Sequence, residues 1–169
     1  RGGQLNHSLM ITYRIDAEDV HAHLFRVTLR VPNPAAQQKL SLPVWIPGSY
    51  LVREFARHLS DLRATQGGEP IALQQLDKAS WLASCSGRAE LVVSALVYAF
   101  DTSVRAAFLD ASRGFFNGTG LCLRVEGRED EPHRIQTGTL PRGWQVATAM
   151  RAIKVDASGR GLYEAADYD

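Results

Sequence analysis

The sequence predicts a mainly β protein, an antiparallel β-sandwich or saddle-like sheets with one short helix or helical turn. Apolar and polar residues alternate along several segments, which is typical of strands that bury one face. Turn-forming residues recur between these segments, at Gly67-Gly68, Ser86-Gly87, Pro141-Arg142-Gly143 and Ser158-Gly159. Many short strands at such spacing are typical of an all-β sandwich.

The first two strands are predicted at residues 9–15 and 21–31. In both segments every second residue is apolar: Leu9, Ile11, Tyr13 and Ile15, then Phe25, Val27, Leu29 and Val31. The polar stretch 16–19 between them has turn composition, so the pair is predicted to form a long hairpin.

The next strands are predicted at 39–44, 91–100 and 120–126, with shorter strands at 70–73, 80–83, 145–150 and 153–155. Segment 91–100 is apolar on both faces, which predicts a position in the middle of a sheet. Pro43 favours a strand end or an edge. Apolar residues spaced by three and four predict a helical turn near 51–57, with the remainder to residue 62 left open as strand.

Composition sets the limits on function. The chain has 169 residues, of which 45% are hydrophobic, so it can bury a core as one domain. Its formal net charge of +1 argues against a nucleic-acid binder held by its overall field, and no apolar run is long enough to span a membrane. The excess of Arg over Lys suggests a bacterial genome, and the compartment stays open: periplasmic, secreted or cytoplasmic. The start at Arg1 rather than Met suggests a processed, tagged or excised chain.

Common catalytic motifs are absent from the sequence: it has no His-Glu-x-x-His, no Gly-x-Ser-x-Gly and no phosphate loop. His21 and His23 would share one face of a strand, but two imidazoles without a third ligand favour partly exposed histidines over a metal site. Cys85 and Cys122 are predicted to be reduced, buried thiols, with a single disulfide as the alternative.

Two aromatic segments are candidates for function. Two prolines around Trp45 to Tyr50 predict a rigid corner, and Phe115-Phe116 follow Arg113-Gly114 in a predicted tight turn. Arg53 and Glu54 would lie on one side of the predicted helical turn, either as a solvated ion pair or as a charged ledge facing a neighbouring domain. For all of these residues, a purely structural role in turning the chain is the alternative.

These segments also carry a resemblance. Residues 42–58, Leu-Pro-Val-Trp-Ile-Pro-Gly-Ser-Tyr-Leu-Val-Arg-Glu-Phe-Ala-Arg-His, resemble a signature near the start of the glycyl aminopeptidase family of zinc peptidases. Residues 97–126 resemble the same family in the order and spacing of Tyr98-Ala99-Phe100-Asp101, Ser103-Val104-Arg105, Leu109-Asp110 and Arg113 to Thr119. Leu140-Pro141, Gly143-Trp144 and the tail 163–169 also fit, so the resemblance spans nearly the whole chain.

The resemblance implies an N-terminal β-domain followed by a thermolysin-like zinc domain, often with a PDZ-like domain after it. Residues 1–8 are then a tag or disordered lead-in, 9–162 the β-domain, and 163–169 the start of a linker to a catalytic domain absent from this chain. Zinc belongs to the parent protein, as does the release of small N-terminal residues such as Gly or Ala. No catalytic residue and no metal ligand is expected in this chain, which alone is expected to be inactive.

The resemblance therefore implies a non-catalytic β-domain that packs on the zinc domain and walls the cleft for the peptide substrate. The candidate cleft or interface residues are Trp45, Tyr50, Arg53, Glu54, Arg113, Phe115, Phe116 and Asn117. Separated from its partner domain, the chain could dimerise through the exposed docking surface. The alternative function is a stand-alone β-sandwich module that binds peptide or carbohydrate.

Overall fold

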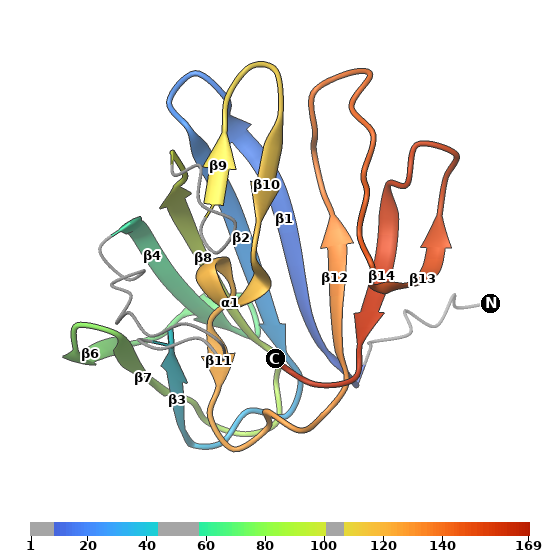
Figure 1. Cartoon of the computed structure of the whole chain (residues 1–169). Helices are drawn as coiled ribbons and strands as arrows, with labels where there is room; N and C mark the ends of the chain where they lie inside the picture. Colours follow the sequence, from blue (N-terminus) through green and yellow to red (C-terminus); the bar gives the residue numbers. More distant parts are fainter. Residues whose placement is uncertain (1–8, 44–57, 101–106) are drawn as a thin grey trace.

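A computed structural model of the chain describes residues 9–43, 58–100 and 107–169, and this part is mainly β (Figure 1). The tag or lead-in predicted at residues 1–8 and the helical turn predicted near 51–57 lie outside the described residues. The strands, in chain order, are β1 Ile11–Asp19, β2 Leu24–Val31, β3 Gln37–Ser41, β4 Leu59–Gln66, β5 Glu69–Pro70, β6 Leu73–Asp77, β7 Ser80–Ser84, β8 Leu91–Tyr98, β9 Ala107–Leu109, β10 Gly114–Phe116, β11 Arg124–Val125, β12 His133–Thr137, β13 Arg151–Val155 and β14 Gly161–Ala165. The described residues also form one short helix, α1 Gly118–Leu121.

Three sheets make up the fold. The large sheet has the order β13-β14-β12-β1-β2-β8-β4-β5, the small sheet β11-β3-β7-β6, and β9 pairs with β10. Neighbouring strands of the described sheets run antiparallel, except that β1 and β12 are parallel. The predicted antiparallel β class is confirmed.

The predicted first hairpin is confirmed and forms the centre of the core. Tyr13 pairs with Leu29 and Ile15 with Val27, and all four side chains are buried. The turn is later than predicted, because β1 continues to Asp19. The Asp19 carboxylate accepts hydrogen bonds from the backbone N–H groups of residues 21 and 22, at 3.0 and 2.9 Å, and this closes the turn. Leu9, predicted to share the buried face, is 78% exposed and precedes β1.

Strand β8 lies between β2 and β4, as the apolar run predicted for the middle of a sheet. Its odd-numbered positions are buried and its even-numbered positions are only half-buried or exposed. The inner face of the large sheet packs against the small sheet and α1 through Leu40, Trp81, Leu121 and Val125. The outer face of the large sheet is therefore not a second core.

The strand predicted at 120–126 is wrong over most of its length. Residues 118–121 form α1, and the strand β11 is limited to Arg124 and Val125. Leu121, Cys122 and Leu123 are all buried, so this segment is enclosed on several sides and does not alternate. The strand predicted at 145–150 is also wrong, because that segment is irregular, while 70–73 is divided between β5 and β6.

The C-terminal residues complete the large sheet. β14 pairs with both β12 and β13, and Tyr168 beyond it packs against the core. The tail that was expected to begin a linker at residue 163 thus starts inside a strand. Cys85 and Cys122 are both buried and unbridged, as predicted. No helix in the described part of the chain is long and apolar enough to cross a membrane.

Candidate functional site

The hairpin β9–β10 carries the candidate residues that the structure describes, and it lies in front of β1 and β2 in Figure 1. Its turn is built by Asp110, whose carboxylate accepts hydrogen bonds from the Ser112 N–H and hydroxyl, both 2.7 Å, and from the Arg113 N–H at 3.0 Å. The Ser112 hydroxyl is the main cause that lowers the pKa of Asp110. All three hydrogen bonds end on Oδ1, so this carboxylate oxygen is engaged in forming the turn.

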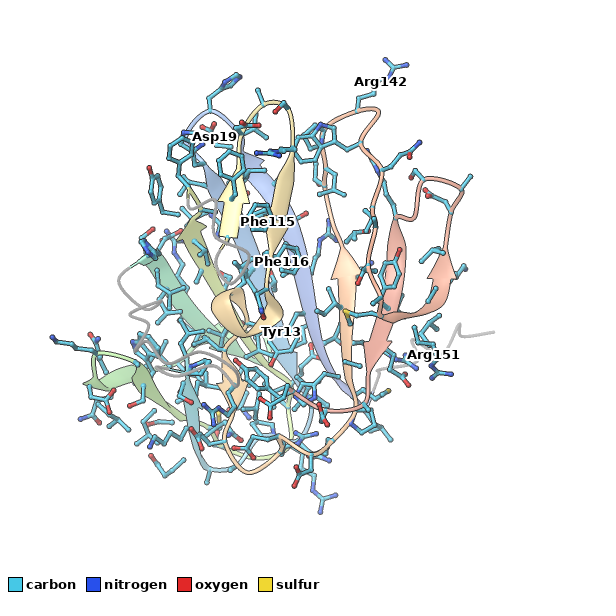
Figure 2. All side chains as sticks on the ribbon, in the orientation of Figure 1. Tyr13, Asp19, Phe115, Phe116, Arg142 and Arg151 are labelled. Atoms are coloured by element: carbon cyan, nitrogen blue, oxygen red, sulfur yellow. The ribbon has the colours of Figure 1, made fainter. Side chains whose placement is uncertain are left out.

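Phe115 and Phe116 lie on opposite sides of β10, because successive side chains of a strand alternate (Figure 2). The Phe116 ring meets Phe25 of β2 edge-on, with ring centroids 5.8 Å apart, and packs against the core. The Phe115 ring instead stacks on Phe108 of β9, at 6.0 Å and 14° between planes. Phe116 therefore attaches the hairpin to the sheet, while Phe115 belongs to its outer surface.

A row of aromatic side chains continues from Phe115. The Phe108 ring stacks on the Phe100 ring with centroids 5.3 Å apart, and the centroids of the Phe100 and His23 rings lie 4.2 Å apart. The guanidinium of Arg113 lies 5.3 Å from the centre of the Phe108 ring, a cation–π arrangement. We define the aromatic row as His23, Tyr98, Phe100, Phe108, Arg113 and Phe115.

The aromatic row is held rigidly but stays open to solvent. Phe108 is 5% exposed, so the middle of the row is buried. The Nδ1–H of His23 donates a hydrogen bond to the Leu109 carbonyl at 2.5 Å. Phe100 is 55% exposed and Tyr98 is 44% exposed, at the end of β8. Exposed aromatic side chains held in place by their neighbours are typical of contact surfaces, because little conformational entropy is lost on binding.

The structure brings only part of the predicted site together. Arg113 and Phe115 lie in the aromatic row, Phe116 lies beneath it, and Asn117 follows β10. Asn117 is half-buried, and its backbone carbonyl accepts a hydrogen bond from the Gly120 N–H at 2.9 Å, at the start of α1. The other candidates lie outside the described residues: Trp45, Tyr50, Arg53 and Glu54. Their roles stay predictions.

The sequence did not indicate that Tyr98, Phe100 and Phe108 belong to one surface. A local signal existed for the first two, because Tyr98 at the end of β8 and Phe100 just beyond it are exposed even-numbered residues, whereas the odd-numbered residues of β8 are buried. Exposed aromatic side chains at the end of an otherwise buried strand indicate a contact surface. Phe108 reaches the row only through the pairing of residue 108 with residue 100.

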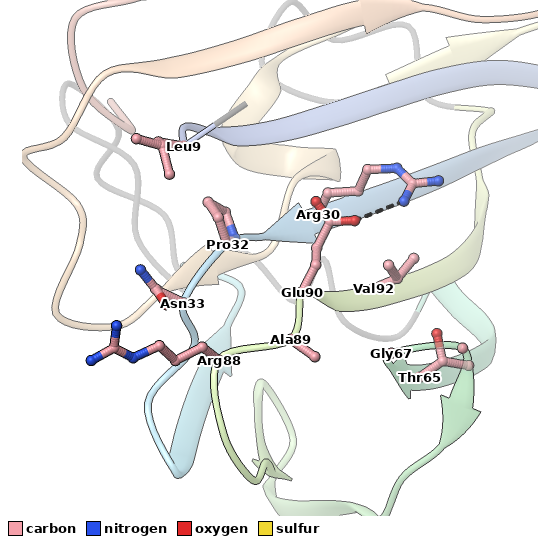
Figure 3. Close-up of a pocket in the computed structure, with 11 residues that line it drawn as sticks. Leu9, Arg30, Pro32, Asn33, Thr65, Gly67, Arg88, Ala89, Glu90 and Val92 are labelled. Carbon is pink, nitrogen blue, oxygen red and sulfur yellow. Dashed lines mark hydrogen bonds and ion pairs between the residues drawn. The ribbon is translucent and has the colours of Figure 1, made fainter. Parts of the chain in front are cut away.

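A separate concavity of about 690 Å³ lies on the outer face of the large sheet (Figure 3). It is lined by Arg30, Asn33, Thr65, Arg88 and Val92, among others. Arg30 is already paired with Glu90 at 2.9 Å, and both side chains are substantially exposed. None of the residues predicted for the site lines this concavity.

Metal ligands and nucleophiles are the side chains on which catalysis by the described residues would depend. They contain no group of three or more His, Cys, Asp or Glu side chains placed to hold a metal ion. The thiol of Cys122 is enclosed, and burial raises its pKa to about 12, so it is no nucleophile at neutral pH. His21 is exposed in the turn, and His23 is engaged with Leu109.

The chain is similar to known proteins over nearly its whole length. The model of the Peptidase M61 N-terminal domain family matches residues 12–169. A crystal structure of an aminopeptidase N family protein from Idiomarina loihiensis is similar to the chain, with 40% sequence identity and a TM-score of 0.90. The match covers 94% of this chain and 27% of that one, so the chain spans about a quarter of that protein's length. No curated protein matches the chain.

Proposed function

Because the chain belongs to the Peptidase M61 N-terminal domain family, we propose that it is the non-catalytic N-terminal β-domain of a zinc-dependent aminopeptidase. The observation that supports this most is the family match over residues 12–169. The similar solved structure agrees with it, because the match covers only 27% of that chain. In such an architecture the remaining part of the parent protein performs the chemistry. This domain then contributes a surface.

The described part of this chain does not offer a zinc site, and we assign the zinc to the remaining part of the parent protein. A zinc site needs three or four nitrogen, sulfur or oxygen ligands that converge, and the described residues provide no such group. We therefore place no catalytic step on these residues. The parent's zinc, and its preference for N-terminal Gly or Ala, rest on the resemblance of residues 42–58 and 97–126 to glycyl aminopeptidases.

The aromatic row and the hairpin β9–β10 are the proposed wall of the substrate cleft and the contact with the zinc domain. An aminopeptidase has to exclude the middle of a longer peptide, which requires a rigid obstruction at one end of the cleft. The hairpin is rigid because the Asp110 turn and the Phe116 anchor hold it from both sides. Arg113 and Phe115 then present a cation and an apolar ring on its outer side.

The test compares this chain with the full product of the gene that encodes it. We expect the full product to release the anilide from glycyl and alanyl anilides, to contain zinc and to lose activity with a chelator. The 169-residue chain is expected to release none. Turnover by the isolated chain, or an inactive full product without zinc, would overturn the proposed function.

A matched pair of variants in the full product tests the cleft wall. Phe115→Ala removes a ring on the outer side of the hairpin, and we expect it to raise the KM for peptide anilides. Ile153→Ala, on the distant exposed strand β13, is the control and should leave the KM unchanged. Equal KM values for the two variants would remove Phe115 from the cleft.

The exposure of Tyr98 and Phe100 also favours a second candidate, a module that binds peptide or carbohydrate through stacked rings. Titration of this chain with oligosaccharides and with unstructured peptides, followed by backbone chemical shifts, separates the two. Shifts confined to residues of the aromatic row, together with a full product that has no peptidase activity, would favour the binding module.

A further inference from the structure

A second group of ring contacts lies inside the protein, away from the aromatic row. We define the interior cluster as Tyr13, His133 and Tyr168. His133 begins β12 and is 3% exposed. Its ring stacks on Tyr13, with centroids 6.0 Å apart and 14° between planes, and meets Tyr168 edge-on at 6.1 Å and 68°. The imidazole is thus enclosed between a core strand and the segment that follows β14.

The two tyrosines hold the segment just after α1, because their hydroxyls donate hydrogen bonds to two consecutive backbone carbonyls. The Tyr13 hydroxyl donates to the Leu123 carbonyl at 2.6 Å, and the Tyr168 hydroxyl donates to the Cys122 carbonyl at 2.7 Å. A helix end leaves carbonyls without intrahelical partners, and these hydroxyls satisfy two carbonyls that follow α1. Residues 166–169 are thereby attached to the element that leads out of the hairpin β9–β10.

His133 is hydrogen-bonded at only one of its ring nitrogens. Its Nδ1 lies 2.6 Å from the Glu131 carbonyl, so in the neutral ring Nδ1–H donates to that oxygen. Its Nε2 is buried and has no partner in the described part of the chain. Protonation would place a second N–H and a positive charge at this site without an acceptor, which is unfavourable in a buried position.

The surrounding charges do not compensate for that burial. Glu131 is paired with Arg128 at 2.6 Å, so the positive charge of Arg128 opposes the effect of this carboxylate on His133. Across the tail, the Arg124 guanidinium lies 5.6 Å from the Tyr168 ring, and only Asp167 adds a further negative charge near His133. Tyr13 and Cys122 stay uncharged, because burial raises the pKa of both. Burial is the main cause that lowers the pKa of His133.

The tail is the part of this enclosure that opens at the lowest cost. Tyr13 and His133 lie in paired strands, and Ile11 also pairs with His133 in the parallel ladder. Beyond Ala165, by contrast, the described hydrogen bonds of residues 166–169 both come from Tyr168: its hydroxyl to Cys122 and its N–H to the Glu129 carbonyl at 2.9 Å. Local opening follows such sparsely bonded segments.

We propose that residues 166–169 form a pH-sensitive latch, in which uncharged His133 keeps Tyr168 closed and protonation of His133 releases it. Opening the latch admits water to Nε2, which then accepts its proton. The latch would set, according to pH, how firmly the chain after β14 is attached to α1 and the hairpin β9–β10. It does not rest on the proposed peptidase function.

The direction of the effect follows from linkage. In the closed form the pKa of His133 is below its ordinary value of about 6.5, and in the open form it returns to about that value. Above about pH 6.5 both forms are neutral and the balance does not change with pH. Below it the open form binds a proton and the closed form does not, so the ratio of closed to open molecules falls by up to about tenfold per pH unit.

Amide hydrogen exchange of this chain, read by NMR as protection factors, tests the latch. Between about pH 7.5 and about pH 5.5 we expect the protection factor of the Tyr168 N–H to fall by up to about tenfold. The N–H groups of the central strands β2 and β8 should keep theirs. His133→Phe should make the Tyr168 value independent of pH, and His21→Phe, in the exposed turn, should leave the pH response unchanged.

Tyr168→Phe is a second variant, which keeps the ring and His133 but removes the hydroxyl. It should lower the protection of residue 168 at both pH values and retain the pH response. If wild-type Tyr168 shows the same protection at both values, or if β2 and β8 lose protection in parallel, the latch is overturned. A pH response that persists unchanged in His133→Phe would also overturn it.

Discussion

The aromatic row and the interior cluster of Tyr13, His133 and Tyr168 both combine histidine and tyrosine rings, and they differ in exposure. In the aromatic row, Phe100 and Tyr98 keep 55% and 44% of their surface in solvent around His23. In the interior cluster, Tyr13 and His133 keep 2% and 3%. Similar ring contacts therefore occur in a surface and in a core, so a ring contact alone does not indicate function.

The difference lies in the polar atoms. Both tyrosines of the interior cluster donate to backbone carbonyls, and a buried polar group without a partner would be costly. Tyr98, by contrast, is 44% exposed, and no hydrogen bond joins its hydroxyl to another residue in the described part of the chain. Burial commits a polar atom to one partner, whereas exposure leaves a ring available to another molecule.

The largest effect is expected in the interior cluster. Tyr13→Ala removes a buried ring and leaves the Leu123 carbonyl without its donor, so we expect it to lower the free energy of unfolding by about 4 kcal/mol. Urea unfolding followed by circular dichroism measures this change. Tyr13→Phe is the matched control and should cost about 1 to 2 kcal/mol, because only the hydrogen bond is lost.

A loss under 1 kcal/mol for Tyr13→Ala would mean that the interior cluster is no more structural than the exposed row. That result would contradict the comparison directly.

An intermediate effect is expected where the hairpin that carries the row meets the core. A Cβ at Gly114 would lie 3.0 Å from a Leu109 methyl and within 3.4 Å of the rings of Trp144 and Phe25. Gly114→Ala should therefore destabilise by about 2 kcal/mol through overpacking. Gly127→Ala is unsuitable as its control, because Gly127 has a positive φ of 89°. Gly118→Ala has open space around its Cβ and should cost less.

The β1–β2 hairpin could be predicted from the sequence, because its alternation is local and one face is fully buried. β12 and β14 could not. β12 has Ile135 as its one apolar residue, and the apolar residues of β14 do not alternate with polar ones. Both segments become strands because each has a pairing partner on both sides. The parallel pairing of β1 with β12 joins segments that are far apart in the chain.

The candidate site divides in the same way. Arg113 and Phe115 were selected from the sequence because they flank a tight turn with two adjacent rings. Phe100 and His23 join them only through tertiary contacts, since residue 100 meets residue 108 in an isolated bridge and His23 bonds Leu109 across the hairpin. No local sequence pattern indicates these two tertiary contacts. For Trp45 and Glu54 the prediction stays untested.

A smaller effect separates two tyrosines. Tyr168→Phe removes a hydrogen bond to a backbone carbonyl and should cost about 1 kcal/mol in the free energy of unfolding at neutral pH. Tyr98→Phe removes an exposed hydroxyl and should change stability by less than about 0.5 kcal/mol. Thermal unfolding of the two variants under the same conditions measures the difference. Equal losses would show that exposure does not distinguish these hydroxyls.

The smallest effect on stability is expected in the aromatic row itself. Phe100→Ala removes a ring that is already 55% exposed, so we expect a change of no more than about 1 kcal/mol in the isolated chain. If the row contacts the proposed zinc domain of the parent, the same substitution in the full product should destabilise it by more than in the isolated chain. Because the chain's own packing is common to both proteins, the difference between the two losses measures the contact and not the fold. Equal losses would leave the row as a surface without a partner, while the peptidase assay of the full product would still decide the proposed function independently.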